Sequence, residues 1–211
     1  MPPAIKICGL TTAEALDAAI AAHADFAGFN FFPPSPRNLA LDQAAALAAR
    51  SGEAIRRVGV FVDADDATLV EAVAAAMLDA LQLHGEETPA RAAKLRTEFG
   101  LPVWKVLTVA SVSDVAKAAT YAGAADLILF DAKTPKGALP GGMGLTFDWS
   151  LLAGWKGGAW GLAGGLTPGN VSEAIRLTGA PLVDTSSGVE TAPGVKDPAL
   201  IAAFCKAARS A

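Results

Sequence analysis

The stretch Lys6-Ile7-Cys8-Gly9-Leu10-Thr11 ends the first apolar segment of this 211-residue chain and directly precedes a helical pattern. It predicts a β-strand, a tight turn and a helix, which is the repeating unit of α/β proteins. The thiol of Cys8 falls at the C-terminal end of that strand. Parallel strands of α/β folds present their C-terminal ends to one face, where such folds build their sites, so Cys8 is a candidate site residue.

The same unit recurs as short apolar segments that alternate with patterns of helical period. Eight strands are predicted, at 4–8, 26–31, 57–61, 80–83, 103–107, 127–131, 160–163 and 182–184. Most are continuous apolar runs, as expected for parallel strands buried on both faces. Helices are predicted at 12–24, 41–50, 66–77, 89–99, 113–121, 168–178 and 198–208, with a short one near 149–152. The segment 132–146 is rich in Gly, Pro and Lys and is predicted to be a mobile loop.

Eight evenly spaced units predict an α/β protein with a single (β/α)8 (TIM) barrel domain over residues 1–211. A doubly wound open sheet uses the same units and is the structural alternative. It is disfavoured because such sheets rarely contain eight even units and no dinucleotide glycine fingerprint follows the first strand. Three helix starts carry capping signals: Thr88 and Thr167, each followed by proline, and the acidic cluster 63–66.

Composition limits the possible environments and partners. Hydrophobic residues make up 52% of the chain, enough for a large core, yet no apolar run approaches the roughly 18 residues of a membrane span. Residues 1–3 do not open a signal peptide, and two cysteines do not make a disulfide framework, so we expect a cytoplasmic protein without a membrane partner. Cys205 is predicted to be a core residue. A net charge of −4 argues against general nucleic-acid binding, although local backbone donors still allow an anionic ligand.

Small residues follow the seventh and eighth predicted strands, in 163–166 and 184–188. In (β/α)8 barrels these two loops often bind phosphate together with the N-terminus of a short extra helix. Small side chains let backbone N–H groups approach an anion, and a helix end adds positive potential. Either loop alone is equally typical of a tight turn that needs glycine. Together they predict a phosphate site formed by Gly164, Gly165, Ser186, Ser187 and Gly188.

Asp131 ends the sixth predicted strand, so a closed barrel brings it to the same cavity as Cys8. A thiolate and a carboxyl group that share a cavity can act as base and acid. Each residue alone has a simpler interpretation: Cys8 as a buried strand cysteine, and Asp131 as the cap of the following turn. A catalytic Cys8 needs activation, because a thiol with a pKa of about 8.5 is only slightly ionised at pH 7, and the sequence does not show the activating group.

Arg37, in the segment Ser35-Pro36-Arg37 after the second strand, is by default a surface residue. On a loop that follows a strand, however, an arginine can bind a substrate carboxylate through two parallel hydrogen bonds. His84 ends the fourth strand and is predicted to contact the substrate rather than to carry protons. The two histidines, His23 and His84, are far apart and no Cys/His cluster is present, so no metal site is predicted.

Taken together, these residues resemble the phosphoribosylanthranilate isomerase family, whose members are barrel enzymes of tryptophan biosynthesis. The resemblance covers nearly the whole chain and rests on segments in the family's order and spacing, at 6–11, 28–32, 35–37, 82–85, 130–131, 141–144, 147–149, 163–166 and 183–190. Single pieces such as Gly164-Gly165 are generic, but the combination is highly specific. Two positions depart from the family pattern: Met143 replaces a small hydroxyl residue, and Thr185 replaces a typical Val.

The resemblance implies an Amadori rearrangement of N-(5-phosphoribosyl)anthranilate to 1-(2-carboxyphenylamino)-1-deoxyribulose 5-phosphate, with no cofactor. It implies that Asp131 is the general acid, Cys8 the general base, and Arg37 the ligand of the anthranilate carboxylate. It further implies that Asp184 contacts the substrate or a residue that binds it, and that the glycine and serine loops hold the phosphate. The expected partner is a small phosphosugar, and the expected assembly is a monomer or homodimer.

Three alternatives stay open from the residues alone. The histidine-pathway isomerase would favour an Asp where Cys8 stands. Indole-glycerol-phosphate synthase requires a catalytic Lys on an early strand, and Lys6 has the strand parity to face inward. A non-catalytic barrel that binds a phosphorylated ligand would bind without turnover, and it gives no reason for pairing Cys8 with Asp131.

Overall fold

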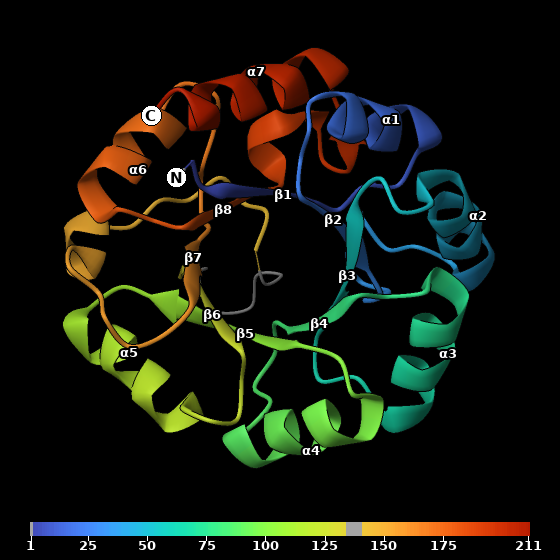
Figure 1. Ribbon diagram of the computed structural model, residues 1–211, viewed down its shortest axis with the longest axis horizontal. Helices are drawn as coiled ribbons and strands as arrows, with labels where there is room; N and C mark the ends of the chain where they lie inside the picture. Colours follow the sequence, from blue (N-terminus) through green and yellow to red (C-terminus); the bar gives the residue numbers. More distant parts are fainter. Residues whose placement is uncertain (1, 134–140) are drawn as a thin grey trace.

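The computed structural model describes residues 2–133 and 141–211 and shows a closed barrel of eight parallel strands (Figure 1). Each strand is hydrogen-bonded to the next in sequence, and the last closes onto the first. The strands are β1 (Ala4–Cys8), β2 (Phe26–Asn30), β3 (Arg56–Phe61), β4 (Ala80–Leu83), β5 (Val103–Val109), β6 (Leu127–Ala132), β7 (Trp160–Leu162) and β8 (Leu182–Thr185). The predicted (β/α)8 barrel is therefore confirmed.

Helices surround the barrel as an outer ring (Figure 1). They are α1 (Ala13–Ala21), α2 (Leu41–Ser51), α3 (Asp66–Ala76), α4 (Pro89–Phe99), α5 (Val112–Ala116), α6 (Val171–Thr178) and α7 (Pro198–Arg209), with 3₁₀ helices η1 (Lys117–Tyr121) and η2 (Trp149–Leu152). The helix predicted at 113–121 is thus divided between α5 and η1. Within 2–133 and 141–211, no helix is both long and apolar enough to cross a bilayer. The loop predicted at 132–146 lies partly outside the described residues, which exclude 134–140.

Two of the three predicted helix starts are confirmed and one is wrong. The side chains of Thr88 and Asp65 accept hydrogen bonds from the first turns of α4 and α3. The start predicted at Thr167 is wrong, because α6 begins three residues after Pro168, at Val171. The amide oxygen of Asn170 instead accepts a 2.8 Å hydrogen bond from the Thr167 N–H, and its amide nitrogen donates to the Gly165 carbonyl at 3.0 Å. Asn170 therefore holds these residues as part of the loop that follows β7.

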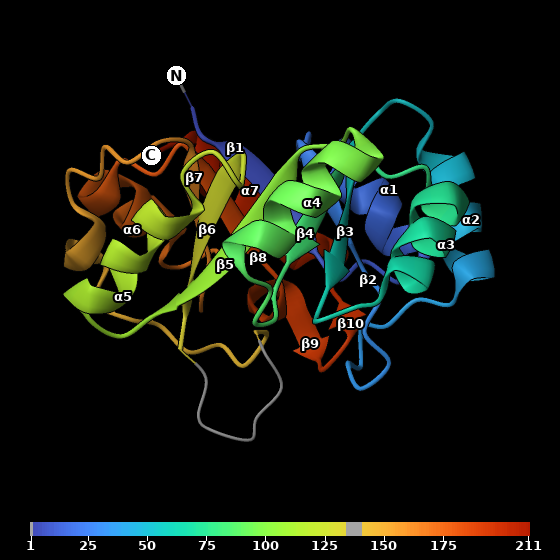
Figure 2. The same cartoon turned by 90° about the horizontal axis from the view of Figure 1, so that it is seen from below.

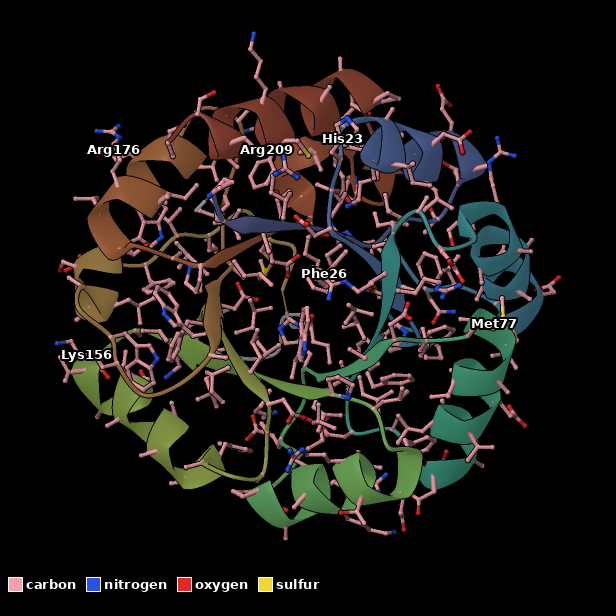
Figure 3. All side chains as sticks on the ribbon, viewed as in Figure 1. His23, Phe26, Met77, Lys156, Arg176 and Arg209 are labelled. Atoms are coloured by element: carbon pink, nitrogen blue, oxygen red, sulfur yellow. The ribbon has the colours of Figure 1, made fainter. Side chains whose placement is uncertain are left out.

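Below the C-terminal ends of the strands, the barrel interior is packed with apolar side chains, which give the site a rigid base. Inward-facing side chains form one cluster, made of Phe26, Val58, Ala80, Trp104, Val106, Leu129, Ala163 and Leu182. Figure 3 shows Phe26 inside the barrel, whereas Arg176 and Lys156 lie at its outer edge. A second and larger apolar cluster joins the outer faces of the strands to the helices. Toward the C-terminal ends of the strands the interior becomes polar, with Lys6, Gln82, Asp131 and Asp184 buried there.

A short hairpin follows β8 and was not predicted. It consists of the 3₁₀ helix η3 (Ser187–Val189) and the antiparallel strands β9 (Glu190–Ala192) and β10 (Val195–Lys196). Figure 2 shows this hairpin at the end of the barrel where the strands terminate. The hairpin therefore stands at the edge of any site built on the C-terminal ends of the strands.

Candidate active site

A cavity opens at the C-terminal ends of the barrel strands. All ten residues predicted to form the site line it: Cys8, Arg37, His84, Asp131, Gly164, Gly165, Asp184, Ser186, Ser187 and Gly188. They come from strands or loops that are distant in sequence but adjacent in a closed barrel. The structure thus brings the predicted residues together, and their contacts indicate what each can do.

Cys8 is the last residue of β1 and is buried at the cavity wall. Gly9 follows with a left-handed backbone (φ 75°), which turns the chain toward α1. The Cys8 thiol donates to the side-chain oxygen of Asn30, on the neighbouring strand, at 3.7 Å. Burial raises the pKa of the Cys8 thiol, and the positive charge of Lys6 lowers that pKa only in part. The raised pKa favours the protonated form of the thiol.

A buried ion pair lies beside the thiol. The Lys6 ammonium is 3.1 Å and 3.2 Å from the two carboxylate oxygens of Asp184. Burial lowers the pKa of Lys6, but the charges of Asp184 and Cys8 and the hydrogen bonds to them together outweigh burial and raise that pKa. A Cβ at Gly28, on β2, would lie 2.9 Å from the Cys8 sulfur and 3.1 Å from the Lys6 nitrogen, so glycine is needed for both groups to sit there. Of the cations around the Cys8 thiol, Lys6 lowers its pKa most, so Lys6 is the best candidate for the activating group.

Asp131 fits both interpretations of a strand-end aspartate. One carboxylate oxygen accepts a hydrogen bond from the Ala132 N–H at 2.7 Å, which is a cap of the following turn. The other oxygen faces the cavity, 3.3 Å from Nε2 of His84. Among the described residues, that Nε2 is buried without a hydrogen-bond partner. The pair therefore places one carboxylate oxygen and one imidazole nitrogen where they can meet a ligand.

Arg37 is buried rather than on the surface, and its contacts differ from the prediction. Its Nε and Nη2 donate to the two carboxylate oxygens of Glu190, each at 2.7 Å, and Nη2 also donates to the Gly142 carbonyl at 3.3 Å. Glu190 thus occupies the edge of the guanidinium that was predicted to bind a substrate carboxylate in a bidentate manner. The Arg37 contacts within the described part of the chain do not use Nη1, which remains the atom that can meet a ligand.

The two glycine and serine loops are packed against each other. Gly164 and Gly165 both have left-handed backbones, with φ of 85° and 62°. A Cβ at Gly188 would lie 1.9 Å from the Leu166 carbonyl oxygen, so only glycine fits there. The Thr185 hydroxyl donates to the same carbonyl at 2.7 Å and connects the loop after β7 to the end of β8. The short helix η3 follows β8, which is where this fold often places the extra helix of a phosphate site.

The tie made by Thr185 leads to a first prediction. Substitution Thr185→Val removes the hydroxyl at nearly constant volume, so we expect it to lower the free energy of unfolding by about 1 kcal/mol and to raise KM a few-fold with kcat unchanged. Denaturant unfolding and steady-state kinetics measure both quantities. Thr185→Ser keeps the hydroxyl and serves as the control. Unchanged stability and KM in the valine variant would show that the tie is dispensable.

Further polar residues at the site were missed, among them Asn30 and Gln82, which line the cavity, and Glu190 and Lys196, which contact Arg37 and Ser186 at its edge. For two of them a signal exists in the sequence, since Asn30 and Gln82 each interrupt an apolar run at an inward-facing strand position. The side-chain oxygen of Gln82 is buried with no hydrogen-bond partner among residues 2–133 and 141–211, which suits a ligand contact. Glu190 and Lys196 lie on a short hairpin whose sequence shows no such pattern.

A closed barrel whose strand-end cavity holds a thiol and a carboxyl group defines an enzyme of the (β/α)8-barrel class. The family model for N-(5'-phosphoribosyl)anthranilate (PRA) isomerase matches residues 5–207. The N-(5'-phosphoribosyl)anthranilate isomerase of Paramagnetospirillum magneticum is 56% identical, over 99% of this chain and 98% of that protein. This chain therefore belongs to the PRA isomerase family. Its activity is that of the family, an isomerisation in tryptophan biosynthesis, and the resemblance predicted from the sequence is confirmed.

Solved structures agree with this assignment. Phosphoribosylanthranilate isomerase from Thermotoga maritima superposes with a TM-score of 0.89 at 34% identity, over 99% of this chain and all of that one. A phosphoribosylanthranilate isomerase in complex with reduced 1-(o-carboxyphenylamino)-1-deoxyribulose 5-phosphate superposes with a TM-score of 0.84 at 31% identity, over 99% of this chain and 100% of that one. The histidine-pathway, indole-glycerol-phosphate and non-catalytic alternatives are therefore set aside.

Proposed function

We propose that the chain performs the Amadori rearrangement of N-(5-phosphoribosyl)anthranilate by general acid–base catalysis, with Asp131 as the acid and Cys8 as the base. The observation that carries this proposal is that both groups line one cavity from the ends of β6 and β1. A related isomerase binds a reduced form of the corresponding product, which supports the same substrate class here.

The proposed chemistry has two proton transfers. Protonated Asp131 donates to the furanose ring oxygen while the bond from that oxygen to C1 breaks, and the anilino nitrogen lone pair forms a C1=N bond. The cationic imine acidifies the C–H at C2. The Cys8 thiolate takes that proton, the electrons form an enamine, and tautomerisation gives the C2 ketone. Each positioned transfer typically contributes about 10²–10⁴-fold. Electrons move only within the substrate, so the scheme needs no cofactor and no metal.

The remaining residues are proposed to bind the substrate. Backbone N–H groups of Gly164, Gly165 and Gly188, with Ser186 and Ser187, suit the phosphate, because small residues let an anion approach the main chain. Binding at this remote end orients the reacting end of the sugar. His84, beside Asp131, is proposed to contact the sugar. Asp184, which forms an ion pair with Lys6, is proposed to contact the substrate or a residue that binds it.

Arg37 is proposed to bind the anthranilate carboxylate through Nη1, since Glu190 holds its other edge. Arg37→Ala is expected to raise KM by about 10- to 100-fold, which corresponds to the loss of a charge-assisted hydrogen bond. Competitive inhibition by anthranilate and by aniline, which lacks the carboxylate, measures this contribution. Arg50→Ala, which removes an exposed arginine paired with Asp17, is the control. Equal binding of the two inhibitors to the wild type would disprove the role of Arg37.

The proposed reaction is tested by the fluorescence of phosphoribosylanthranilate generated in situ. Rapid loss of the signal with the wild-type protein is expected, together with formation of the carboxyphenylamino product. Folded protein that leaves the signal unchanged would overturn the proposal and favour another phosphosugar substrate.

The setting of the reaction is part of the same proposal. We propose that the chain acts in the cytoplasm, as a monomer or homodimer, on a small phosphosugar and without a nucleic-acid or membrane partner. The two cysteines support this location, since both are buried and free, as expected in a reducing compartment.

A further inference from the structure

The hairpin β9–β10 brings two buried charges to the edge of the cavity, and the proposed acid–base chemistry uses neither. The side chains of Glu190 and Lys196 are only 4% and 1% exposed. Burying a charge is costly unless the charge is fully paired, and a buried ion pair by itself is weak support for stability. The contacts of these two residues therefore point to a role at the site.

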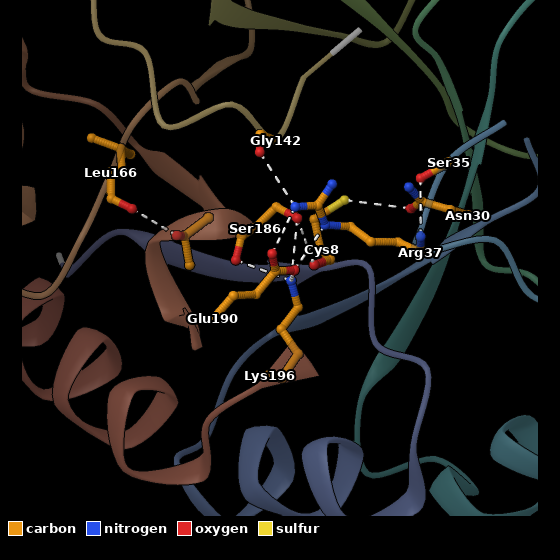
Figure 4. Close-up of polar contacts among 10 residues, drawn as sticks. Cys8, Asn30, Ser35, Arg37, Gly142, Leu166, Ser186, Glu190 and Lys196 are labelled. Atoms are coloured by element: carbon orange, nitrogen blue, oxygen red, sulfur yellow. Dashed lines mark hydrogen bonds and ion pairs between the residues drawn. The ribbon is translucent and has the colours of Figure 1, made fainter. Parts of the chain in front are cut away.

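Their hydrogen bonds form one continuous network (Figure 4). The Glu190 carboxylate accepts two bonds from Arg37 and a third, at 2.6 Å, from the Lys196 ammonium. Lys196 also donates to the carbonyl of Ser186 at 3.0 Å and to its hydroxyl at 3.2 Å. The Ser186 hydroxyl donates to the Cys8 carbonyl at 3.1 Å. The network thus runs from Arg37, through the hairpin, to the end of β1.

The two ends of the network coincide with the two anionic ends of the substrate. Arg37 lies at the proposed carboxylate site, and Ser186 lies in the proposed phosphate loop. Loops beyond strand ends are more mobile than the barrel that carries them. A catalytic geometry tolerates errors of only about 0.5 Å, so two anion sites on separate loops need a fixed separation.

We propose that Glu190 and Lys196 are positioning residues that form a strut between Arg37 and Ser186, so that a substrate held at both ends places its reacting carbons between Asp131 and Cys8. This inference rests on the proposed function. The strut also sets the local charge: two cations and one carboxylate leave a net charge of +1, which favours a ligand that is anionic at both ends.

A merely structural role makes a different prediction, and the chain offers a matched control. Glu87 and Lys105 form another buried ion pair, 2.8 Å apart, with side chains 4% and 2% exposed. It lies outside the lining of the cavity. If Glu190 only stabilises the fold, Glu190→Gln and Glu87→Gln will both lower the free energy of unfolding, and neither will change ligand binding.

The test uses Glu190→Gln, Lys196→Met and Glu87→Gln in the full chain, after denaturant unfolding has shown that each is folded. Three probes are titrated calorimetrically: anthranilate, ribose 5-phosphate, and the reduced carboxyphenylamino-deoxyribulose phosphate, which carries both anionic groups. For the Glu190 and Lys196 variants we expect the two-ended probe to bind about tenfold or more weakly, with losses of about threefold or less for each one-ended probe. In steady-state kinetics we expect KM to rise and kcat to fall in both variants. Glu87→Gln is expected to bind all three probes as the wild type does.

Two results would overturn the strut. One is unchanged binding of the two-ended probe by both variants. The other is an equal loss for all three probes, which would indicate local damage at one pocket. Failure of the proposed function itself is distinguishable, because the wild-type protein would then neither bind the two-ended probe nor consume phosphoribosylanthranilate.

Discussion

Replacement of Cys8 by alanine is expected to lower kcat by a factor of about 10²–10⁴ while the fold stays intact. The methyl group cannot accept the proton from C2 of the imine, and no later step can compensate for its retention. The fold should tolerate the change, because the hydrogen bond from the thiol to Asn30 is long and weak, at 3.7 Å. Loss of substrate fluorescence with wild type and variant side by side measures the effect, and circular dichroism checks the fold.

Cys205→Ala is the matched control for this variant. Cys205 is also a buried thiol, but it lies on α7 and burial raises its pKa to about 11. It packs in the apolar core, as predicted, so its alanine variant should keep full activity. Near-normal kcat in Cys8→Ala would remove the thiol as the base.

The base also needs a thiolate, and the structure suggests where its stabilisation originates. Burial disfavours the charged form of Cys8, whereas the charge of Lys6 favours it. Cys8→Ser has nearly the same shape but a hydroxyl that is far less acidic than a thiol, so it should be almost as inactive as the alanine variant. An inactive serine variant would show that the reaction requires an ionisable group at this position and not only a side chain of this shape.

The barrel could be predicted from the sequence because buried parallel strands are apolar runs separated by helical patterns. All eight strands occur at the predicted places, with ends that differ by at most two residues; β5, for example, continues to Val109. The hairpin β9–β10 was not predicted because strands of three and two residues are too short to show a hydrophobic period. The start of α6 was misplaced because Asn170 bonds to Thr167 and keeps the local Thr-Pro signal outside the helix.

The site was predictable wherever its residues stand at strand ends, since barrel closure alone brings such ends to one cavity. Cys8, His84 and Asp131 are of this kind. Glu190 and Lys196 are not, because their burial depends on a tertiary neighbour. In a closed barrel β8 adjoins β1 and β1 adjoins β2, so the hairpin after β8 meets the loop after β2 that carries Arg37. No local pattern in the sequence predicts this contact between the hairpin and Arg37.

Asp131→Asn is expected to lower kcat by a similar factor of about 10²–10⁴, but at the other proton transfer. The asparagine oxygen can still accept the hydrogen bond from the Ala132 N–H, so the backbone after β6 should be preserved. The amide, however, cannot deliver a proton to the furanose oxygen. Asp114→Asn, at another buried aspartate outside the cavity lining, is the control and should retain full activity.

Deuterium at C2 of the substrate separates the two roles. In Asp131→Asn, ring opening becomes rate-limiting, so the C2 isotope effect on kcat should vanish. In Cys8→Ser, removal of the C2 proton becomes rate-limiting, so the effect should reach its full size. An isotope effect that grows in Asp131→Asn would place that carboxyl group at the C2 step instead. Near-wild-type turnover in the same variant would transfer the role of acid to His84, whose Nε2 lies 3.3 Å from the Asp131 carboxylate and at the same cavity wall.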